Sequence, residues 1–159
     1  MSDGTIVVVN PASANGRTGR RWPELAAKLR SRIGDFEAAF TKAPKEATSI
    51  VRQALRDGTN HVVSVGGDGT HNEVINGFFD GREQVAEGIK LSLIPTGTGG
   101  DLRRTVGLPD SPIDAIDYVI THELCHMAVP HHGPAFFDLL NRVLPDWQLR
   151  KQRLEQRMA

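Results

Sequence analysis

Cysteine is almost absent from this 159-residue sequence: Cys125 is the single example, which excludes a disulfide within the chain and is typical of a reducing compartment. No apolar run approaches the ~18 residues that a membrane-spanning helix needs. Neither sign of charge dominates, since lysine plus arginine number 19 and aspartate plus glutamate also number 19. Bulk charge therefore gives no indication of nucleic-acid binding. No signal peptide precedes Thr5, and we expect a soluble cytoplasmic protein.

Two common nucleotide-binding motifs are also missing. The phosphate loop G-x-x-x-x-G-K-[ST] does not occur. The dinucleotide fingerprint G-x-G-x-x-G fails because a series starting at Gly67 and Gly69 has Asn72 where the third glycine should stand. The sequence has instead two glycine-rich turns, GGDGT at 66–70 and GTGGD at 97–101. Each turn places an aspartate beside glycine amides, a combination suited to holding Mg²⁺ against phosphate oxygens.

The first glycine turn follows a short apolar, β-branched run at 61–65, which predicts a buried strand. Thr70 is predicted to cap the helix that follows, and Glu73 to complete a capping box. Unpaired N–H groups at a helix start attract anions, and phosphate is the usual ligand. The alternative is a plain strand-to-helix turn, for which one glycine would suffice. Three glycines in four positions favour phosphate binding.

Apolar runs and helical periodicity alternate along the chain. Strands are predicted at 5–9, 36–40, 61–65 and 91–94, and helices at 22–33, 47–55 and 70–79. Pro23 is acceptable in the first of these helices if it lies in the first turn. This alternation predicts an α/β fold with a doubly wound parallel sheet and right-handed crossovers, followed by a C-terminal helical tail. Ligands of such sheets bind beyond the carboxyl ends of the strands, where four loops of this chain meet.

Four motifs occur in order at these loops: Asn10-Pro11, Thr41, GGDGTHNEVING at 66–77 and IPTGTGGDLRRTVGLP at 94–109. Together they resemble the diacylglycerol kinase catalytic domain, a family that includes bacterial lipid kinases and is related in fold to NAD kinase. The resemblance covers roughly residues 4–117. It implies ATP and Mg²⁺ as co-substrates, phosphoryl transfer to a lipid hydroxyl such as that of diacylglycerol, and peripheral contact with a membrane.

The same resemblance assigns the site residues. Asp68 would lie near the phosphates and the metal as the catalytic residue, and Glu73 would cap the helix or shape the site. The implied nucleotide contacts are Asn10, Thr41, Gly66, Gly67, Asp68, Gly69, Thr70, Asn72 and Thr98.

Two features depart from the family pattern. Gly100 stands where the family has the asparagine of GTGND, so one side-chain hydrogen bond is lost. Family members also carry a second, β-rich lobe with the lipid pocket and the general base. A β-sandwich needs about 100 residues, and the stretch after the resemblance is too short for one. We therefore expect this chain to bind ATP with Mg²⁺ but to phosphorylate little lipid by itself. A non-catalytic nucleotide-binding remnant is the alternative.

The C-terminal stretch carries a different motif. His122-Glu123-Leu124-Cys125-His126 has the HExxH spacing of zinc peptidases, in which Glu123 would be the catalytic base. A chance pair of solvated histidines is the alternative. Residues 113–158 resemble the end of the YgjP-like zinc metallopeptidases, which implies Zn²⁺ bound by His122, His126 and His132. It also implies that Cys125 is a small core residue, and that the core of the tail contains Phe136, Phe137, Leu139, Leu140, Val143 and Leu144.

Two units are therefore predicted: a nucleotide-binding domain at 1–112 and a helical tail at 113–159. A zinc metallopeptidase is the second functional hypothesis, although the rest of that family's substrate cleft is missing. The sequence does not distinguish a genuine fusion of the two families from an accident of sequence assembly.

Overall fold

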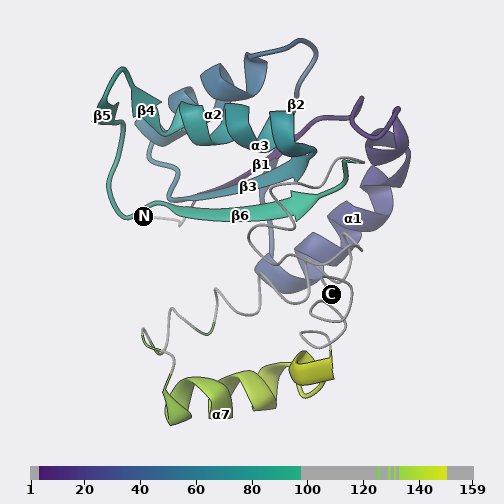
Figure 1. The fold of residues 1–159 in the computed structure, drawn as a ribbon, viewed down its shortest axis with the longest axis vertical. Coiled ribbons are helices and arrows are strands. Elements are labelled where there is room, and N and C mark those ends of the chain that lie inside the picture. Colours follow the sequence, from purple (N-terminus) through teal and green to yellow (C-terminus); the bar gives the residue numbers. More distant parts are fainter. Residues whose placement is uncertain (1–3, 98–124, 126–128, 130, 132, 150–159) are drawn as a thin grey trace, which may run out of the picture.

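The computed structural model describes residues 4–97, 125, 129, 131 and 133–149 (Figure 1). Its elements, in chain order, are β1 (Thr5–Val9), α1 (Arg17–Ile33), β2 (Glu37–Phe40), α2 (Glu46–Arg56), β3 (His61–Gly66), α3 (Asp68–Gly77), β4 (Phe79–Asp80), β5 (Glu83–Gln84), β6 (Lys90–Pro95) and α7 (Pro134–Val143). The four predicted strands are therefore all present.

The main sheet is parallel and has the strand order β2-β1-β3-β6. Val7 lies opposite Ala38 of β2 on one side and opposite Val63 of β3 on the other, and Val63 lies opposite Ser92 of β6. The chain thus runs outward from β1 to β2 and then returns past β1 to β3. The direction of winding reverses between β1 and β3, which is where ligands bind in such sheets.

Both faces of the sheet are covered, which explains why the strands read as continuous apolar runs. Val7, Val63 and Ile94 pack against Leu25 and Leu29 of α1. The alternate strand positions face the other way and pack against α2 and α3, in a cluster containing Ile6, Val8, Val62, Val51, Leu55, Val74 and Phe78. Figure 1 shows α2 and α3 over one face of the sheet and α1 on the opposite face.

Two predicted helix starts are wrong, and in both cases the cap is a glycine. Helix α1 begins at Arg17 after Gly16, whose φ of 77° is left-handed, so Pro23 lies inside the helix and not in its first turn. Helix α3 begins at Asp68 after Gly67, with no side-chain hydrogen bond at its cap. The capping box predicted for Thr70 is therefore absent. A glycine cap has no side chain that could mark the helix start in the sequence.

A two-stranded hairpin, β4 with β5, follows α3 and was not predicted. Its strands are too short to show a periodic pattern. Arg52 of α2 donates a hydrogen bond to the carbonyl of Phe79 at 2.6 Å, and Arg56 pairs with Asp80 at 2.7 Å. Polar contacts to α2 therefore hold the start of the hairpin.

The tail has a small apolar cluster of its own, made by Cys125, Phe136, Leu140, Leu144 and Trp147. The burial of Cys125 agrees with its prediction as a core residue. The prediction was wrong for Phe137 and Val143, which are 37% and 47% exposed. The buried face repeats every four residues, at positions 136 and 140 of α7 and at 144 directly after the helix. Within the described residues, no helix combines the length and apolar character needed to cross a bilayer.

A buried polar pair joins α3 to the sheet. His71 Nδ1 lies 2.7 Å from Ser64 Oγ on β3, and both side chains are almost fully buried. His71 Nε2 is buried and has no hydrogen-bond partner among the described residues. Burial lowers the pKa of His71 from 6.5 to about 4, although nearby Asp68 acts in the opposite direction. His71 is therefore neutral at physiological pH.

This burial predicts an acid-sensitive fold. Folding weakens proton binding by His71. The contribution of neutral His71 to the unfolding free energy is therefore fully present above pH 6.5 and is lost as the pH falls toward 4. The difference between the two pKa values corresponds to roughly 3 kcal/mol of unfolding free energy. Urea unfolding of the wild type and of His71→Leu at pH 7.5 and 4 would measure it. Between pH 7.5 and 4, the unfolding free energy of the wild type should fall by roughly 3 kcal/mol more than that of the variant. Equal losses in both proteins would contradict the prediction.

Candidate functional site

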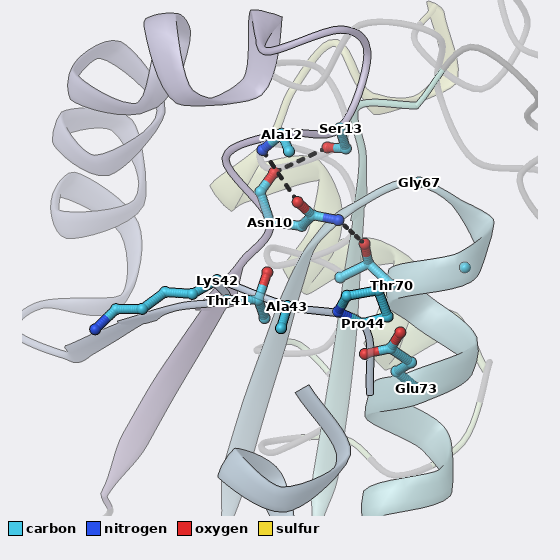
Figure 2. A pocket seen from close by; sticks show the side chains of 11 residues that line it. Asn10, Ala12, Ser13, Thr41, Lys42, Ala43, Pro44, Gly67, Thr70 and Glu73 are labelled. Carbon is cyan, nitrogen blue, oxygen red and sulfur yellow. Dashed lines mark hydrogen bonds between the residues drawn. The ribbon is translucent and has the colours of Figure 1, made fainter. Parts of the chain in front are cut away.

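A cavity of about 400 Å³ lies beyond the carboxyl ends of β1, β2 and β3 (Figure 2). Three segments line it: the loop after β1, the loop after β2 and the first turns of α3. The lining residues are Asn10, Ala12, Ser13, Thr41, Lys42, Ala43, Pro44, Gly67, Gly69, Thr70 and Glu73. The cavity therefore lies at the point where the direction of winding of the sheet reverses.

Asn10 joins the first loop to α3. Its Oδ1 accepts a hydrogen bond from the N–H of Ala12 at 3.0 Å, which leaves Nδ2 to donate to Thr70 Oγ1, also at 3.0 Å (Figure 2). These two contacts together fix which end of the amide faces α3. Since Thr70 Oγ1 accepts this bond, its own hydrogen is left for another acceptor, and none is found among the described residues. Thr70 can therefore donate to an oxygen in the cavity.

The glycine bend before α3 is closely packed. A Cβ on Gly66 would lie 2.5 Å from the Cβ of Thr70, so only glycine fits there. A Cβ on Gly97 would lie 2.6 Å from the Cα of Gly67, because the bends after β3 and β6 touch backbone to backbone. The N-terminus of α3 thus opens toward the cavity with no side chain capping it. Its N–H groups and helix dipole favour an anion.

The loop after β2 forms one wall of the cavity, and the carboxylate of Glu46 fixes this loop by hydrogen bonds. Thr41 donates its N–H to the carbonyl of Val9 at 2.9 Å and is buried. Glu46 accepts hydrogen bonds from the N–H groups of Lys42 and Ala43, which lower the pKa of Glu46, with the bond from Lys42 as the larger cause. Figure 2 shows the Lys42 side chain extending away from Thr70. The ammonium group therefore does not face the helix start.

Glu73 is the acidic side chain that lines the cavity. It lies on α3, more than one turn after the glycine bend, and Figure 2 shows it beside Pro44. Its backbone carbonyl accepts a hydrogen bond from Thr48 at 2.8 Å. Its carboxylate has no partner among the described residues. A carboxylate repels phosphate, so it suits a hydroxyl donor or a cation.

The residues named from the sequence are brought together in part. Five of the implied nucleotide contacts line the cavity: Asn10, Thr41, Gly67, Gly69 and Thr70. Glu73, named as a residue that caps the helix or shapes the site, lines it as well. Gly66 lies behind the bend as the last residue of β3, and Asp68 is the first residue of α3 without lining the cavity. Asn72 is exposed and accepts a hydrogen bond from Asn76 at 3.0 Å. Thr98 lies outside the described residues.

Sequence reasoning did not assign Ala12, Ser13, Lys42, Ala43 and Pro44 to the site. Each of them lies within four residues of a strand end, and that position was the signal available in the sequence. The proposed zinc-site residues His122, Glu123, His126 and His132 lie outside the described part of the chain. The described residues contain no group of three or more histidine, cysteine or acidic side chains that could hold a metal ion.

Comparison with known proteins gives one consistent result. The family model of the diacylglycerol kinase catalytic domain matches residues 4–131. The match extends beyond residue 117, where the resemblance noted in the sequence ended, and it runs across the HExxH segment. The comparisons lend no support to the metallopeptidase resemblance.

The similar proteins include a diacylglycerol kinase of Staphylococcus haemolyticus, which is 32% identical over 72% of this chain and 33% of its own length. One from Staphylococcus saprophyticus is 29% identical over 82% of this chain and 42% of its own length. A solved diacylglycerol kinase of Bacillus anthracis has a TM-score of 0.63 at 24% identity over 74% of this chain, which shows the fold. The chain thus spans well under half the length of these relatives.

Because the bends after β3 and β6 touch, we expect alanine substitution to affect stability differently at Gly97 and at Gly69. Gly97→Ala should lower the unfolding free energy by about 1–3 kcal/mol, because its methyl group would meet the backbone of Gly67. Gly69→Ala is the matched control, since a Cβ there has nothing within 4 Å. It should leave stability unchanged or raise it by up to about 1 kcal/mol, as in other helices. Urea unfolding would measure both, and equal effects would contradict the packing described.

Proposed function

Since the chain belongs to the family of the diacylglycerol kinase catalytic domain, we propose that it forms the nucleotide-binding half of an ATP-dependent lipid kinase. The reaction is phosphoryl transfer from ATP to a lipid hydroxyl, such as that of diacylglycerol. The observation that carries this proposal is the cavity where the loops after β1, β2 and β3 meet. Its volume of about 400 Å³ is in the range of small-molecule sites.

The phosphates of ATP bind at the start of α3. The N–H groups beside Gly67 and Gly69 are backbone donors with no side-chain cap, and Thr70 adds a hydroxyl donor that Asn10 orients. Such donors attract phosphate without a lysine. The orientation of Lys42 away from Thr70 agrees with this arrangement (Figure 2).

The sugar and the base lie further along the cavity, away from the helix start. Residues of α3 rise by about 1.5 Å each, so Glu73 is several ångströms from the first N–H groups of the helix. Its carboxylate would repel phosphate but accepts hydrogen bonds from ribose hydroxyls. Ala43 and Pro44 form an apolar wall beside Glu73, suited to one face of the base.

Magnesium fits this site as part of the nucleotide complex. Asp68, at the first position of α3, would hold it through carboxylate oxygen, the ligand that Mg²⁺ prefers. Bound Mg²⁺ neutralises negative charge on the phosphoryl oxygens during transfer. Phosphate oxygens of ATP and water would supply the other ligands, as is usual for Mg²⁺ bound with a nucleotide.

Lipid phosphorylation is proposed for a protein in which this half is joined to the remainder found in the relatives. The chain covers 33% and 42% of two of those relatives. The lipid pocket, the general base and the peripheral membrane contact are assigned to that remainder. Within this chain, we retain the division between a nucleotide-binding domain at 1–112 and a tail at 113–159.

ATP binding by this chain tests the proposal directly. Calorimetry with ATP and Mg²⁺ should show one site, and Asn10→Ala should weaken binding about tenfold because Thr70 loses the group that orients it. Asn76→Ala is the matched control, since Asn76 bonds within α3 to Asn72 and does not line the cavity.

Two results would contradict the assignment: absence of binding in the wild type, or equal affinities in the wild type and Asn10→Ala. A chain that binds ATP but transfers no phosphoryl group, even when joined to the remainder of a relative, would be the non-catalytic remnant.

The role of Glu73 predicts selectivity for the sugar. The wild type should bind ATP about tenfold more tightly than 2′,3′-dideoxy-ATP, since a hydrogen bond to a carboxylate contributes about 1.5 kcal/mol. Glu73→Gln should reduce this ratio to about threefold, because a neutral amide accepts more weakly. Glu83→Gln, an exposed carboxylate in β5, is the control. If Glu73→Gln keeps the full ratio but changes the Mg²⁺ dependence, the carboxylate serves the metal and this assignment is wrong.

A further inference from the structure

Three hydroxyl groups from separate segments meet behind the cavity. Thr18 lies in the first turn of α1, Ser13 in the loop after β1, and Thr96 directly after β6. Thr18 Oγ1 lies 2.7 Å from both Thr96 Oγ1 and Ser13 Oγ, and Ser13 Oγ lies 3.2 Å from Thr96 Oγ1. Thr18 is 1% exposed. We call these three residues the hydroxyl cluster.

The three hydroxyl hydrogens of the hydroxyl cluster all go to oxygen atoms of the protein. Ser13 Oγ also donates to the carbonyl of Asn10 at 3.0 Å, so the three hydroxyls make four oxygen–oxygen contacts. Each hydroxyl has one hydrogen to donate. Ser13 donates to Asn10 and Thr18 donates to Thr96, so the hydrogen of Thr96 is the one that can be donated to Ser13 Oγ. No hydrogen is then left for a ligand. Although Ser13 lines the cavity, its hydroxyl therefore holds the loop in place and does not bind phosphate.

Thr96 is held from two sides. Its N–H donates to the carbonyl of Gly66 at 2.7 Å, while its hydroxyl accepts from Thr18. The next residue, Gly97, donates to the same carbonyl at 3.3 Å and contacts the backbone of Gly67. The hydroxyl cluster thus ties the start of α1 to the bends after β3 and β6. It fixes the distance between the Asn10 loop and the start of α3.

We propose that Thr18 and Thr96 are positioning residues for the nucleotide site, an inference that rests on the proposed function. They act through Ser13 and Gly66 and do not touch the nucleotide themselves. Their hydrogen bonds hold the loop of Asn10 at the distance from α3 at which the helix N–H groups and Thr70 converge on one phosphate. Misplacement of groups in a reaction site by about 1 Å can slow the reaction by about 100-fold.

The stability of the fold alone does not account for this arrangement. The hydroxyl cluster belongs to neither apolar cluster of the sheet. A hydrogen bond between hydroxyls contributes little net stability, because the same groups would bond to water in the unfolded chain. What the cluster supplies is a fixed geometry, because a hydrogen bond specifies distance and direction whereas an apolar contact does not.

Thr18→Val tests the proposal, since valine keeps the shape of threonine and removes the hydroxyl. We expect ATP affinity to fall about fivefold, the effect of one lost hydrogen bond, and Thr18→Ser to restore it. Ser92→Ala is the matched control: Ser92 is also buried, lies in β6 and bonds to His61 at 3.0 Å, far from the cavity. It should lower the melting temperature without changing ATP affinity. Unchanged affinity in Thr18→Val, or an equal loss in Ser92→Ala, would overturn the proposal.

A second measurement needs no nucleotide. Amide hydrogen exchange at Thr96 and Gly97, which donate to Gly66, should become at least about tenfold faster in Thr18→Val and should not change in Ser92→Ala. Unchanged exchange in Thr18→Val would overturn the positioning role even if ATP binds. If exchange is faster but the wild type binds no ATP, the proposed function fails, and with it the part of this inference that concerns the nucleotide.

Discussion

The amide of Asn10 is the contact on which the cavity depends. It accepts from the loop after β1 and donates to α3, so it bridges the two segments that diverge where the sheet reverses its winding. Helices α1 and α3 cover opposite faces of the sheet, so their N-terminal ends belong to different apolar clusters. Apolar packing therefore does not connect these two helix ends. A polar side chain with a donor at one end and an acceptor at the other is suited to this position. The hydroxyl cluster and the contact between Gly67 and Gly97 extend the same connection to β6.

The site attracts anions through the backbone more than through side-chain charge. Bare N–H groups at a glycine-capped helix start provide the positive potential, and Lys42 extends elsewhere (Figure 2). Such backbone donors are compatible with a chain that has equal numbers of basic and acidic residues. In the proposed nucleotide complex, the carboxylate of Glu73 would restrict where the phosphates can lie, because like charges repel. One end of the cavity, at Gly67, offers backbone hydrogen-bond donors, and the other, at Glu73, offers a carboxylate acceptor.

The sequence predicted the sheet well, because its central strands β1 and β3 are short β-branched runs buried on both faces. Asn10, Thr41, Gly67, Gly69 and Thr70 were named because they lie at or shortly after strand ends, and all of them line the cavity, whereas Gly66, Asp68 and Asn72 of the same prediction do not. The prediction failed at the starts of α1 and α3, where Gly16 and Gly67 leave no capping side chain to recognise. The hydroxyl cluster could not have been found, since Thr18 and Thr96 are 78 residues apart and ordinary in their local contexts. Contacts of that kind depend on the completed fold.

The pairing of Ser13 with Thr96 spans 83 positions of the chain, and this separation orders the steps by which the protein assembles. β1, α1 and β2 are adjacent in sequence and can pair early, whereas closing a loop of that length is slower. During synthesis on a ribosome, the first loop must wait until β6 has emerged. The cavity therefore takes its final shape late in folding, after β1, α1 and β2 have been able to pack together. On a ribosome, a nascent chain would consequently form its first apolar contacts before the cavity is complete.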